Sequence, residues 1–288
     1  MRIDLHTHSA ASDGTMSPAA VLRAAVDARL DVVALTDHDT TAGWAEAAAA
    51  VPSGLTLIRG AELSCVWWPA DRDQPPISLH LLAYLFDPAE PRLRAERLRV
   101  REGRVGRART MVERMVADGH DMRWDDVAEE AGGGPVGRPH VARAMVRRGL
   151  VSTMDEAFTA AWIGAGGRYR VAKPDTNVLT AIELVRAAGG VPVFAHPMAA
   201  KRGLLVPDGA YAVLAEAGLG GIEANHVDHE PPARQKIRAI AAELGLFVTG
   251  SSDFHGANKT IALGAETTEP SAYERLLSEA SGVEPVRG

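Results

Sequence analysis

Histidine and carboxylate residues recur in short groups along this chain, and most groups follow or end an apolar run. The groups are His6-Thr7-His8 with Asp13, Asp37-His38, Glu62, His80, His196-Pro197 and Asp253-Phe254-His255. Because side chains alternate across a strand, the outer residues of His-x-His and Asp-x-His point the same way and can grip one ion. Imidazole and carboxylate suit Zn²⁺, Mn²⁺ or Fe²⁺, and the lack of thiolate partners argues against a purely structural zinc site.

Each group alone has an ordinary structural explanation. A single His-x-His or Asp-His pair is common in turns, and a lone histidine such as His80 is often a hydrogen-bonded core residue. The interpretation changes because the groups fall at successive predicted strand ends. In α/β barrels and open α/β sheets, active sites are built at the carboxyl edge of the strands. We therefore expect a metal site there.

The elements that must position these groups alternate between strands and helices. Apolar, β-rich runs predict strands, and Ser17-Pro18 provides an N-cap and a first-turn proline for a helix that ends near residue 29. The predicted strands cover residues 3–6, 31–36, 55–59, 77–86, 191–195, 221–224 and 246–249. Such alternation predicts a parallel sheet covered by helices.

The middle of the chain differs, because residues 88–167 show helical periodicity and turn signals without a convincing strand. Nine arginines between Arg92 and Arg114 face only three acidic residues. Four of these arginines recur at helical spacing and would line one helix face: Arg94, Arg97, Arg101 and Arg104. That face is either a solvated surface or a surface that guides a phosphate-bearing substrate. We expect a barrel domain over 1–87 and 168–288 and a helical insertion, or cap, over 88–167.

Composition narrows the class of protein. The 288 residues are 46% hydrophobic with a formal net charge of −6, which argues against a general nucleic-acid binder with a wholly basic surface. We find no apolar run near the roughly 18 residues that span a bilayer, and no secretory signal at the N-terminus. The single cysteine, Cys65, fits a reducing compartment. These features predict a cytoplasmic protein that does not bind membranes, and no stable protein partner is indicated.

Five sequence blocks carry a resemblance to a known family. They are Asp4-Leu5-His6-Thr7-His8-Ser9, Ala34-Leu35-Thr36-Asp37-His38-Asp39, Gly60-Ala61-Glu62, Ala195-His196-Pro197 and Ser252-Asp253-Phe254-His255. As an ordered set, they resemble the signature of the PHP (polymerase and histidinol phosphatase) family. The resemblance implies an α/β fold, a distorted (β/α)7 TIM-like barrel with a mostly helical insertion, and two or three divalent metal ions.

The resemblance also implies which residues bind each ion. His6, His8, Glu62 and Asp253 would hold the first ion, and Glu62 would bridge to a second ion completed by His80 and His196. Asp13, His38 and His255 would hold the third. All nine positions carry suitable residues. His80 is the least securely aligned, because no distinctive motif surrounds it.

Three further segments, 137–142, 169–174 and 189–192, resemble the branch of nucleotide phosphatases that act on 3′,5′-bisphosphates and short 5′-phosphorylated RNA. Arg138 could clamp a phosphate through its planar fork. Further candidates for contacts with the substrate or leaving group are His140, Lys173, Asn225 and His226. Each of these five residues has a surface or capping role as its structural alternative.

The predicted activity is metal-dependent hydrolysis of nucleotide phosphate monoesters by a metal-bound hydroxide. The expected partner is a small phosphorylated substrate, and no protein side chain is assigned to acid–base catalysis. The alternatives are a metabolite phosphatase of the histidinol phosphate type, an amidohydrolase-like enzyme that cleaves carbon–nitrogen bonds, and a metal-binding module without activity. Ligand types alone do not separate the enzyme classes.

Overall fold

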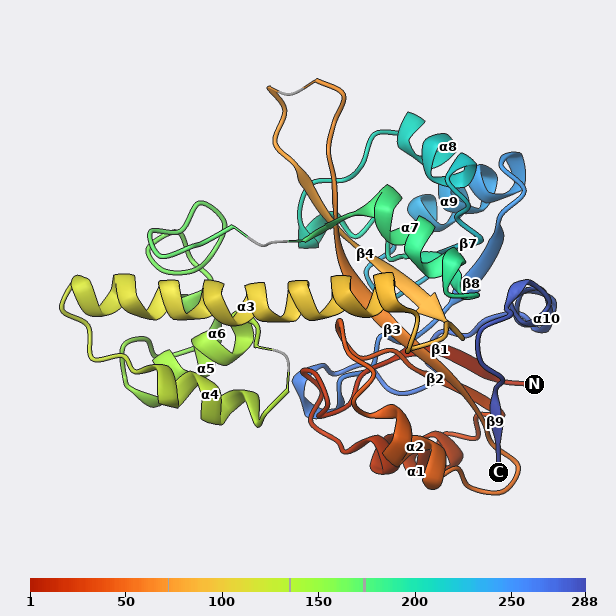
Figure 1. The fold of residues 1–288 in the computed structure, drawn as a ribbon, viewed down its shortest axis with the longest axis horizontal. Coiled ribbons are helices and arrows are strands. Elements are labelled where there is room, and N and C mark those ends of the chain that lie inside the picture. The colour runs from red at the N-terminus through yellow and green to blue at the C-terminus, as the bar shows by residue number, and fades with distance from the viewer. Residues whose placement is uncertain (72, 135, 173–174) are drawn as a thin grey trace. The chain divides into compact units, whose positions relative to one another are not determined.

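The computed structural model describes residues 1–288 except Arg72, Pro135, Lys173 and Pro174 (Figure 1). The chain divides into two compact units, Met1–Arg97 with Asp175–Gly288, and Leu98–Pro174. We call them the barrel unit and the helical unit. Each has its own buried apolar clusters. The helical unit begins and ends several residues later than the predicted insertion, 88–167.

Seven strands of the barrel unit form an almost closed barrel. They are β1 (Ile3–Thr7), β2 (Val32–Leu35), β3 (Thr56–Trp67), β4 (Ile77–Tyr84), β6 (Val191–Ala195), β7 (Gly221–Asn225) and β8 (Phe247–Gly250). Neighbours pair in the order β1-β2-β3-β4-β6-β7-β8. A parallel bridge between Thr7 and Phe254 joins β1 to the segment after β8. The predicted distorted seven-stranded barrel is confirmed.

The predicted parallel sheet is wrong at β4, which runs antiparallel to both β3 and β6. The connection over residues 68–76 is too short for the helical crossover that two parallel strands need, so β3 and β4 form a hairpin. β3 extends well past the predicted 55–59. Glu62 therefore lies inside a strand and not after its end. His80 lies inside β4, opposite Ser64 on one side and Ala195 on the other.

Six α-helices of the barrel unit surround these strands. They are α1 (Pro18–Asp27), α2 (Trp44–Ala49), α7 (Val178–Ala187), α8 (Gly209–Glu216), α9 (Pro231–Glu243) and α10 (Pro270–Glu279). In Figure 1, α1 and α2 lie on one side of the strands and α7, α8 and α9 on the other. The Ser17 side chain accepts a hydrogen bond from the Ala20 N–H, as the predicted cap requires.

The remaining elements of the barrel unit are short or were not expected. β5 (Thr176–Asn177) and β9 (Val286–Arg287) both pair with β3, and η1 (Ala200–Arg202) and η2 (Gly256–Asn258) are single 3-10 turns. The sequence predicted no element after residue 249, so α10 and β9 were missed. The two turns matter for the site, because they follow the ends of β6 and β8.

The helical unit contains α4 (Trp124–Ala131), α5 (Arg138–Arg147) and α6 (Met154–Ala157), and the long helix α3 (Pro91–Ala117) enters it from the barrel unit. Its core is made of methionine and valine side chains such as Met111, Met115 and Met145. Among its described residues there is no strand. Across the described part of the chain, no helix is long and apolar enough to cross a membrane.

Candidate active site

Nine side chains of the barrel unit converge at the ends of its strands and in the middle of the β3–β4 hairpin. They are His6, His8, Asp13, His38, Glu62, His80, His196, Asp253 and His255. Eight of them fall into three overlapping groups in which one possible ligand atom per residue lies within 4.8 Å of the others. The ninth, His196, points its Nε2 at the Glu62 Oε1, 3.0 Å away. The residues that the sequence singled out are thus neighbours in space.

The first group consists of His6, His8, Glu62 and Asp253, all buried. The Nε2 atoms of His6 and His8 lie 3.1 Å apart, and they are 3.2 and 3.1 Å from Glu62 Oε2. Asp253 Oδ1 is 3.5 and 3.4 Å from the same two nitrogens. Ligands that bind one ion at about 2.0–2.2 Å lie roughly 3–3.5 Å from each other in tetrahedral or octahedral geometry. The spacing fits one divalent ion.

The second group consists of His38, Glu62 and His80. It centres on Glu62, whose two oxygens face different partners. His80 Nδ1 lies 2.7 Å and His196 Nε2 3.0 Å from Oε1, whereas His38 Nδ1 lies 3.2 Å from Oε2. A carboxylate that turns one oxygen toward each of two ligand groups is placed to bridge two ions. His38 also approaches Asp13, with its Nε2 3.7 Å from Oδ2, so it borders two groups.

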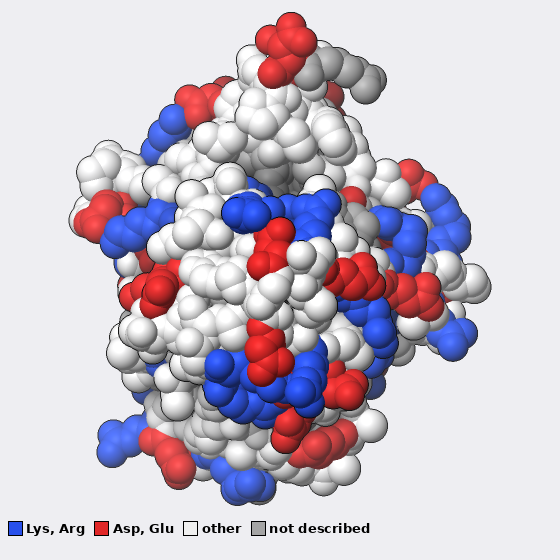
Figure 2. All heavy atoms as spheres, turned by 90° about the vertical axis from the view of Figure 1, so that its left-hand side faces the viewer, with Lys and Arg blue, Asp and Glu red and all other residues white. Residues whose placement is uncertain are grey.

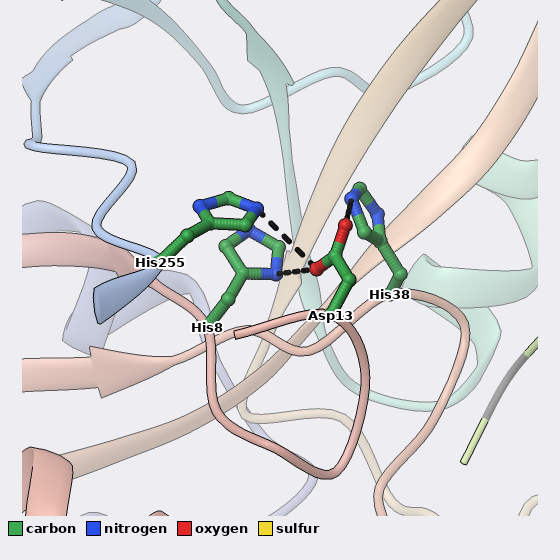
Figure 3. A group of neighbouring side chains, drawn as sticks. All are labelled: His8, Asp13, His38 and His255. Atoms are coloured by element: carbon green, nitrogen blue, oxygen red, sulfur yellow. Dashed lines mark ion pairs between the residues drawn. The ribbon is translucent and has the colours of Figure 1, made fainter. Parts of the chain in front are cut away.

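The third group consists of His8, Asp13, His38 and His255, which point toward one another in Figure 3. Asp13 Oδ1 lies 3.3 Å from His255 Nε2 and 3.7 Å from His8 Nδ1. His8 thus belongs to two groups through its two ring nitrogens. A neutral imidazole has one lone pair, so His8 can bind in only one of them.

Among the ring nitrogens of the cluster, the buried Nδ1 atoms of His8 and His38 make no hydrogen bond with a described residue, although His38 Nδ1 lies 3.2 Å from Glu62 Oε2. Buried polar atoms without partners are uncommon in folded proteins and call for a physical explanation. Both atoms lie among carboxylates and other imidazoles, where a bound cation would satisfy His38 Nδ1, and would satisfy His8 Nδ1 if His8 binds through that atom and not through Nε2. The donor set and these two atoms therefore fit divalent metal ions.

Comparison with known proteins agrees with this geometry. The sequence model of the PHP domain matches residues 4–98. The chain is 34% identical to a 3′,5′-nucleoside bisphosphate phosphatase of Chromobacterium violaceum, over 88% of this chain and 87% of that protein. It is 30% identical to the 5′-3′ exoribonuclease Rnm of Salmonella typhimurium, over 94% and 91%. The chain belongs to the PHP family.

A solved structure supports the same assignment. A Bifidobacterium adolescentis protein described as a metal-dependent phosphoesterase superposes with a TM-score of 0.87 and 34% identity, covering 97% of this chain and 96% of that one. The protein is therefore a PHP-type metal-dependent phosphoesterase. The resemblance found in the five sequence blocks is confirmed.

Backbone conformation helps to orient two of the nine clustered side chains of the PHP barrel. His196 follows β6 with φ 32°, and Asp253 follows β8 with φ 53°, both in the left-handed region that non-glycine residues rarely adopt. Such conformations cluster at functional sites because the surrounding structure must hold them. Gly14 packs against the carbonyl of His8, where a Cβ atom would lie 2.6 Å from the oxygen. The loop that carries Asp13 can therefore fold back on β1.

Glu223 was missed by the sequence analysis, although it contacts two of the nine clustered residues, His6 and His196. Its Oε1 accepts from His6 Nδ1 at 3.2 Å, and its Oε2 accepts from the His196 backbone N–H at 2.8 Å. The carboxylate is fully buried. By accepting a hydrogen bond from Nδ1–H, Glu223 favours the tautomer of neutral His6 whose Nε2 lone pair is free for a metal. The available signal was a lone glutamate inside the otherwise apolar strand 221–224.

Two buried aspartates hold the loops of the PHP site. Asp37 accepts hydrogen bonds from the Ser9 N–H and from the hydroxyls of Ser9 and Ser12, which fixes the loop before Asp13. Asp4 accepts from the backbone N–H groups of His6, Ser252 and Gly264, which ties β1 to the segments after β8. Burial raises the pKa of both carboxyl groups, although these hydrogen bonds oppose the shift.

The central carboxylates remain ionised despite burial. Burial alone would raise the pKa of Glu62, but the imidazoles of His80, His38 and His6 hold it well below its usual value. Asp253 behaves in the same way, because His6 and Lys259 outweigh burial and lower its pKa. Burial, helped by the positive charge of Arg202, lowers the pKa of His196 to about 3. Charged oxygens and a neutral imidazole are the forms that bind metals, and His8, whose pKa rises to about 9 because Asp253 and Glu62 outweigh burial, must lose its proton to join them.

Two of the five predicted substrate contacts lie in the barrel unit. His226 is fully buried, with its Nε2 3.3 Å from Asp253 Oδ2, so it adjoins the metal-ligand groups. Asn225 ends β7, and its side-chain oxygen accepts from the Arg238 guanidinium at 2.6 Å. Their contact with substrate stays a prediction.

The other three belong to residues 98–174. Arg138 donates to the Ile163 carbonyl at 3.3 Å and lies 5.5 Å over the Phe158 ring, both inside the helical unit. His140 is buried, and its Nδ1 accepts from the Gly137 N–H at 2.9 Å at the start of α5. Lys173 lies outside the described residues. Substrate contacts for these residues also stay predictions.

Proposed function

We propose that this PHP enzyme hydrolyses phosphate monoesters of nucleotides, with 3′,5′-bisphosphates or short 5′-phosphorylated RNA as its substrates. The observation that carries the proposal is the pair of relatives named for a nucleoside bisphosphate and for RNA, each aligned over roughly nine-tenths of this chain. The substrates in both names contain a phosphate ester of a nucleotide. The substrate assignment goes beyond what family membership gives.

We further propose that the nine converging side chains bind two or three divalent ions, Mn²⁺, Zn²⁺ or Fe²⁺. His6, His8, Glu62 and Asp253 would hold one ion, Glu62 with His80 and His196 a second, and Asp13 with His38 and His255 a third. Ions bound there would activate water near neutral pH and neutralise negative charge on the phosphoryl oxygens. Histidine and carboxylate ligands accept several first-row metals, so loading with each metal decides the identity.

Differences in exposure within the cluster support one direction of approach for the substrate. The side chains of His6 and Glu62 are 0% and 1% exposed. Asp13, His38 and His80 are 22%, 14% and 23% exposed, so they form the side of the cluster that solvent reaches. We infer that the phosphate group enters over these three residues while the buried carboxylates set the positions of the imidazoles.

The two units differ in charge, which supports a binding role for the helical one. Residues 98–174 contain 14 Lys and Arg against 10 Asp and Glu, whereas the rest of the chain contains 17 against 27. A phosphorylated substrate needs positive charge that the barrel unit as a whole lacks. We propose that the predicted insertion, 88–167, is a cap that recognises the nucleotide, and that 1–87 with 168–288 is the metal-binding barrel. Nucleotide substrates and the single cysteine support a cytoplasmic location.

The test measures the products formed by manganese-loaded protein from four compounds: adenosine 3′,5′-bisphosphate, AMP, histidinol phosphate and a 5′-phosphorylated RNA dinucleotide. Hydrolysis of a monoester releases inorganic phosphate, whereas hydrolysis of the phosphodiester in the dinucleotide releases nucleoside monophosphates, so both products are quantified. We expect kcat/KM to be at least tenfold higher for the bisphosphate or the dinucleotide than for the other two. AMP is the matched control for the bisphosphate, because it lacks only the 3′-phosphate. A preference for histidinol phosphate would contradict the nucleotide assignment and place the enzyme among metabolite phosphatases.

A further inference from the structure

The two oxygens of Asp253 face different surroundings. Oδ1 faces the ring nitrogens of His6, His8 and His255 at 3.4–3.5 Å. Oδ2 faces away from this group, toward Lys259 Nζ at 2.6 Å and Arg202 Nη2 at 2.7 Å. Two cations from the turns after β6 and β8 therefore meet on the outer oxygen of a predicted metal ligand.

A third donor also reaches Oδ2. His226 Nδ1 accepts the Asp228 backbone N–H at 3.0 Å, which places the proton on Nε2, 3.3 Å from Oδ2. One carboxylate oxygen has two lone pairs, and here three donors surround it. Holding Asp253 in place therefore does not require both cations. The donors around Asp253 Oδ2 thus exceed what that oxygen can accept, so donor groups of Arg202 and Lys259 are available to another anion.

Exposure separates the two cations from the groups they contact. The side chains of Arg202 and Lys259 are each 32% exposed, whereas Asp253 is 2% exposed. Both cations thus stand between the buried ligand groups and solvent. The Nη1 atom of Arg202 has no hydrogen bond or ion pair with any described residue, and its Nε is held by Asp228 at 2.7 Å. A fixed guanidinium with an unused N–H pair beside a lysine suits a phosphate oxygen.

We propose that Arg202 and Lys259 form an anion subsite that binds the phosphoryl group at the metal cluster. Its ligand is a phosphate monoester dianion, or the inorganic phosphate released from it. The inference rests on the proposed function for the identity of the substrate, but the subsite itself requires only that phosphate binds. Arg202 contacts a phosphoryl oxygen through Nη1, and Lys259 adds positive charge on the same side. Asp228 and Asp253 hold both side chains before substrate arrives.

The test measures binding of inorganic phosphate to the manganese-loaded protein by isothermal titration calorimetry, with metal content determined on the same samples. We expect Arg202→Gln and Lys259→Gln each to raise the Kd for phosphate about tenfold or more, with metal content equal to that of the unchanged protein. Lys259→Arg, which keeps the charge, should restore most of the affinity. Arg186→Gln is the matched control, because Arg186 pairs with Glu279 at 2.9 Å and is 30% exposed but takes no part in the site. Its phosphate affinity should not change.

A purely structural role for the two cations gives a different result. In that case the variants lose metal, and phosphate affinity at equal metal content stays within twofold of the unchanged protein, which would overturn the proposal. If Arg202→Gln does not fold, Lys259→Gln decides alone, since its side chain lies on a short turn at the surface. Failure of the proposed function is separable, because it appears as no turnover of nucleotides by protein that still binds phosphate.

Discussion

In the barrel unit, the carboxylates with the most charged neighbours are buried, whereas in the helical unit they lie at or near the surface. Glu62 and Glu223 are 1% and 0% exposed, and both contact histidines. Asp126 and Glu129 of α4 are 16% and 73% exposed, and both pair with Arg147. Burying a charge costs several kcal/mol unless it is well compensated, so buried charges are weak evidence for stability and better evidence for a site.

The helical unit shows the opposite arrangement. Figure 2 shows basic and acidic side chains next to each other on one face of the molecule, and within the helical unit Arg143, Arg147 and Arg148 all pair with acidic residues of α4. Exposed ion pairs of this kind contribute about 0–1 kcal/mol each and weaken in salt. The apolar cluster around Met111, Val127 and Met145 therefore stabilises this unit. The comparison predicts that metals and buried carboxylates matter for one unit and hardly at all for the other.

Removal of metal should give the largest effect and should separate the two units. Chelation with EDTA should abolish phosphate release and lower the melting temperature by about 5–10 °C, because an ion at one hundred times its Kd contributes roughly 2.7 kcal/mol of stability. Hydrogen exchange should rise in β1, β3 and the segments after β6 and β8. Hydrogen exchange should change little in residues 98–134 and 136–172 of the helical unit. Equal increases of hydrogen exchange in both units would contradict the predicted difference between them.

Glu62→Gln should give the next largest effect, since Glu62 contacts His6, His8, His38, His80 and His196. Loss of a residue that hydrogen-bonds to a metal ligand lowers metal affinity about 10–100-fold. We expect a larger loss for Glu62→Gln, because Glu62 is itself a proposed ligand shared by two ions. Activity and bound manganese should fall together, as measured by kcat/KM and by metal analysis. Glu279→Gln, in a partly buried ion pair of the same unit, is the control and should keep both.

Glu223→Gln should have a smaller effect, because Glu223 acts through two ligands. The glutamine amide can still accept from His6 Nδ1, but its NH₂ group then faces the His196 N–H, which Glu223 Oε2 accepts at 2.8 Å. We expect manganese affinity to fall about 10–100-fold with kcat largely recovered at saturating metal. A fall in kcat that excess manganese does not correct would show that Glu223 does more than position His6 and His196.

The strands and the clustering of histidines and carboxylates could be predicted from the sequence because both depend on local patterns, whereas the seven-stranded barrel was implied by the resemblance to the PHP family. Buried strands are apolar runs, and His-x-His on such a strand projects both rings to one side, as His6 and His8 do. The β3–β4 hairpin could not be predicted with the same rule. Strand direction depends on pairing across the sheet, so Glu62 was expected after a strand end and lies in mid-strand instead, whereas His80 lies within its strand as expected.

Residues that contact the proposed metal ligands were missed for a related reason. Glu223, Arg202 and Lys259 carry no motif, and their roles arise from contacts with residues 27 or more positions away or from the turn that brings them to Asp253. Of these three residues, only Glu223 is recognisable in the sequence, as a charged residue in a buried strand. Arg202 and Lys259 resemble any surface cation until the fold places both on one oxygen.

The smallest effect should come from Asp126→Asn in the helical unit. Asp126 pairs with Arg148 at 2.6 Å and Arg147 at 3.0 Å, and the hydrogen bond from Arg148 lowers its pKa below the usual range. A lowered carboxyl pKa gives stability above the unfolded-state pKa of about 3.9, and this stability is lost as pH falls through the folded-state value. At pH 7 and low salt we expect a loss of about 0.2–1 kcal/mol in the free energy of unfolding, read from hydrogen exchange of α4 and α5 in increasing urea.

The difference in stability between Asp126→Asn and the unchanged protein should vanish in 1 M salt and at low pH, where Asp126 is protonated. A loss above about 3 kcal/mol would mean that this pair behaves as a buried one, and the contrast between the two units would then fail.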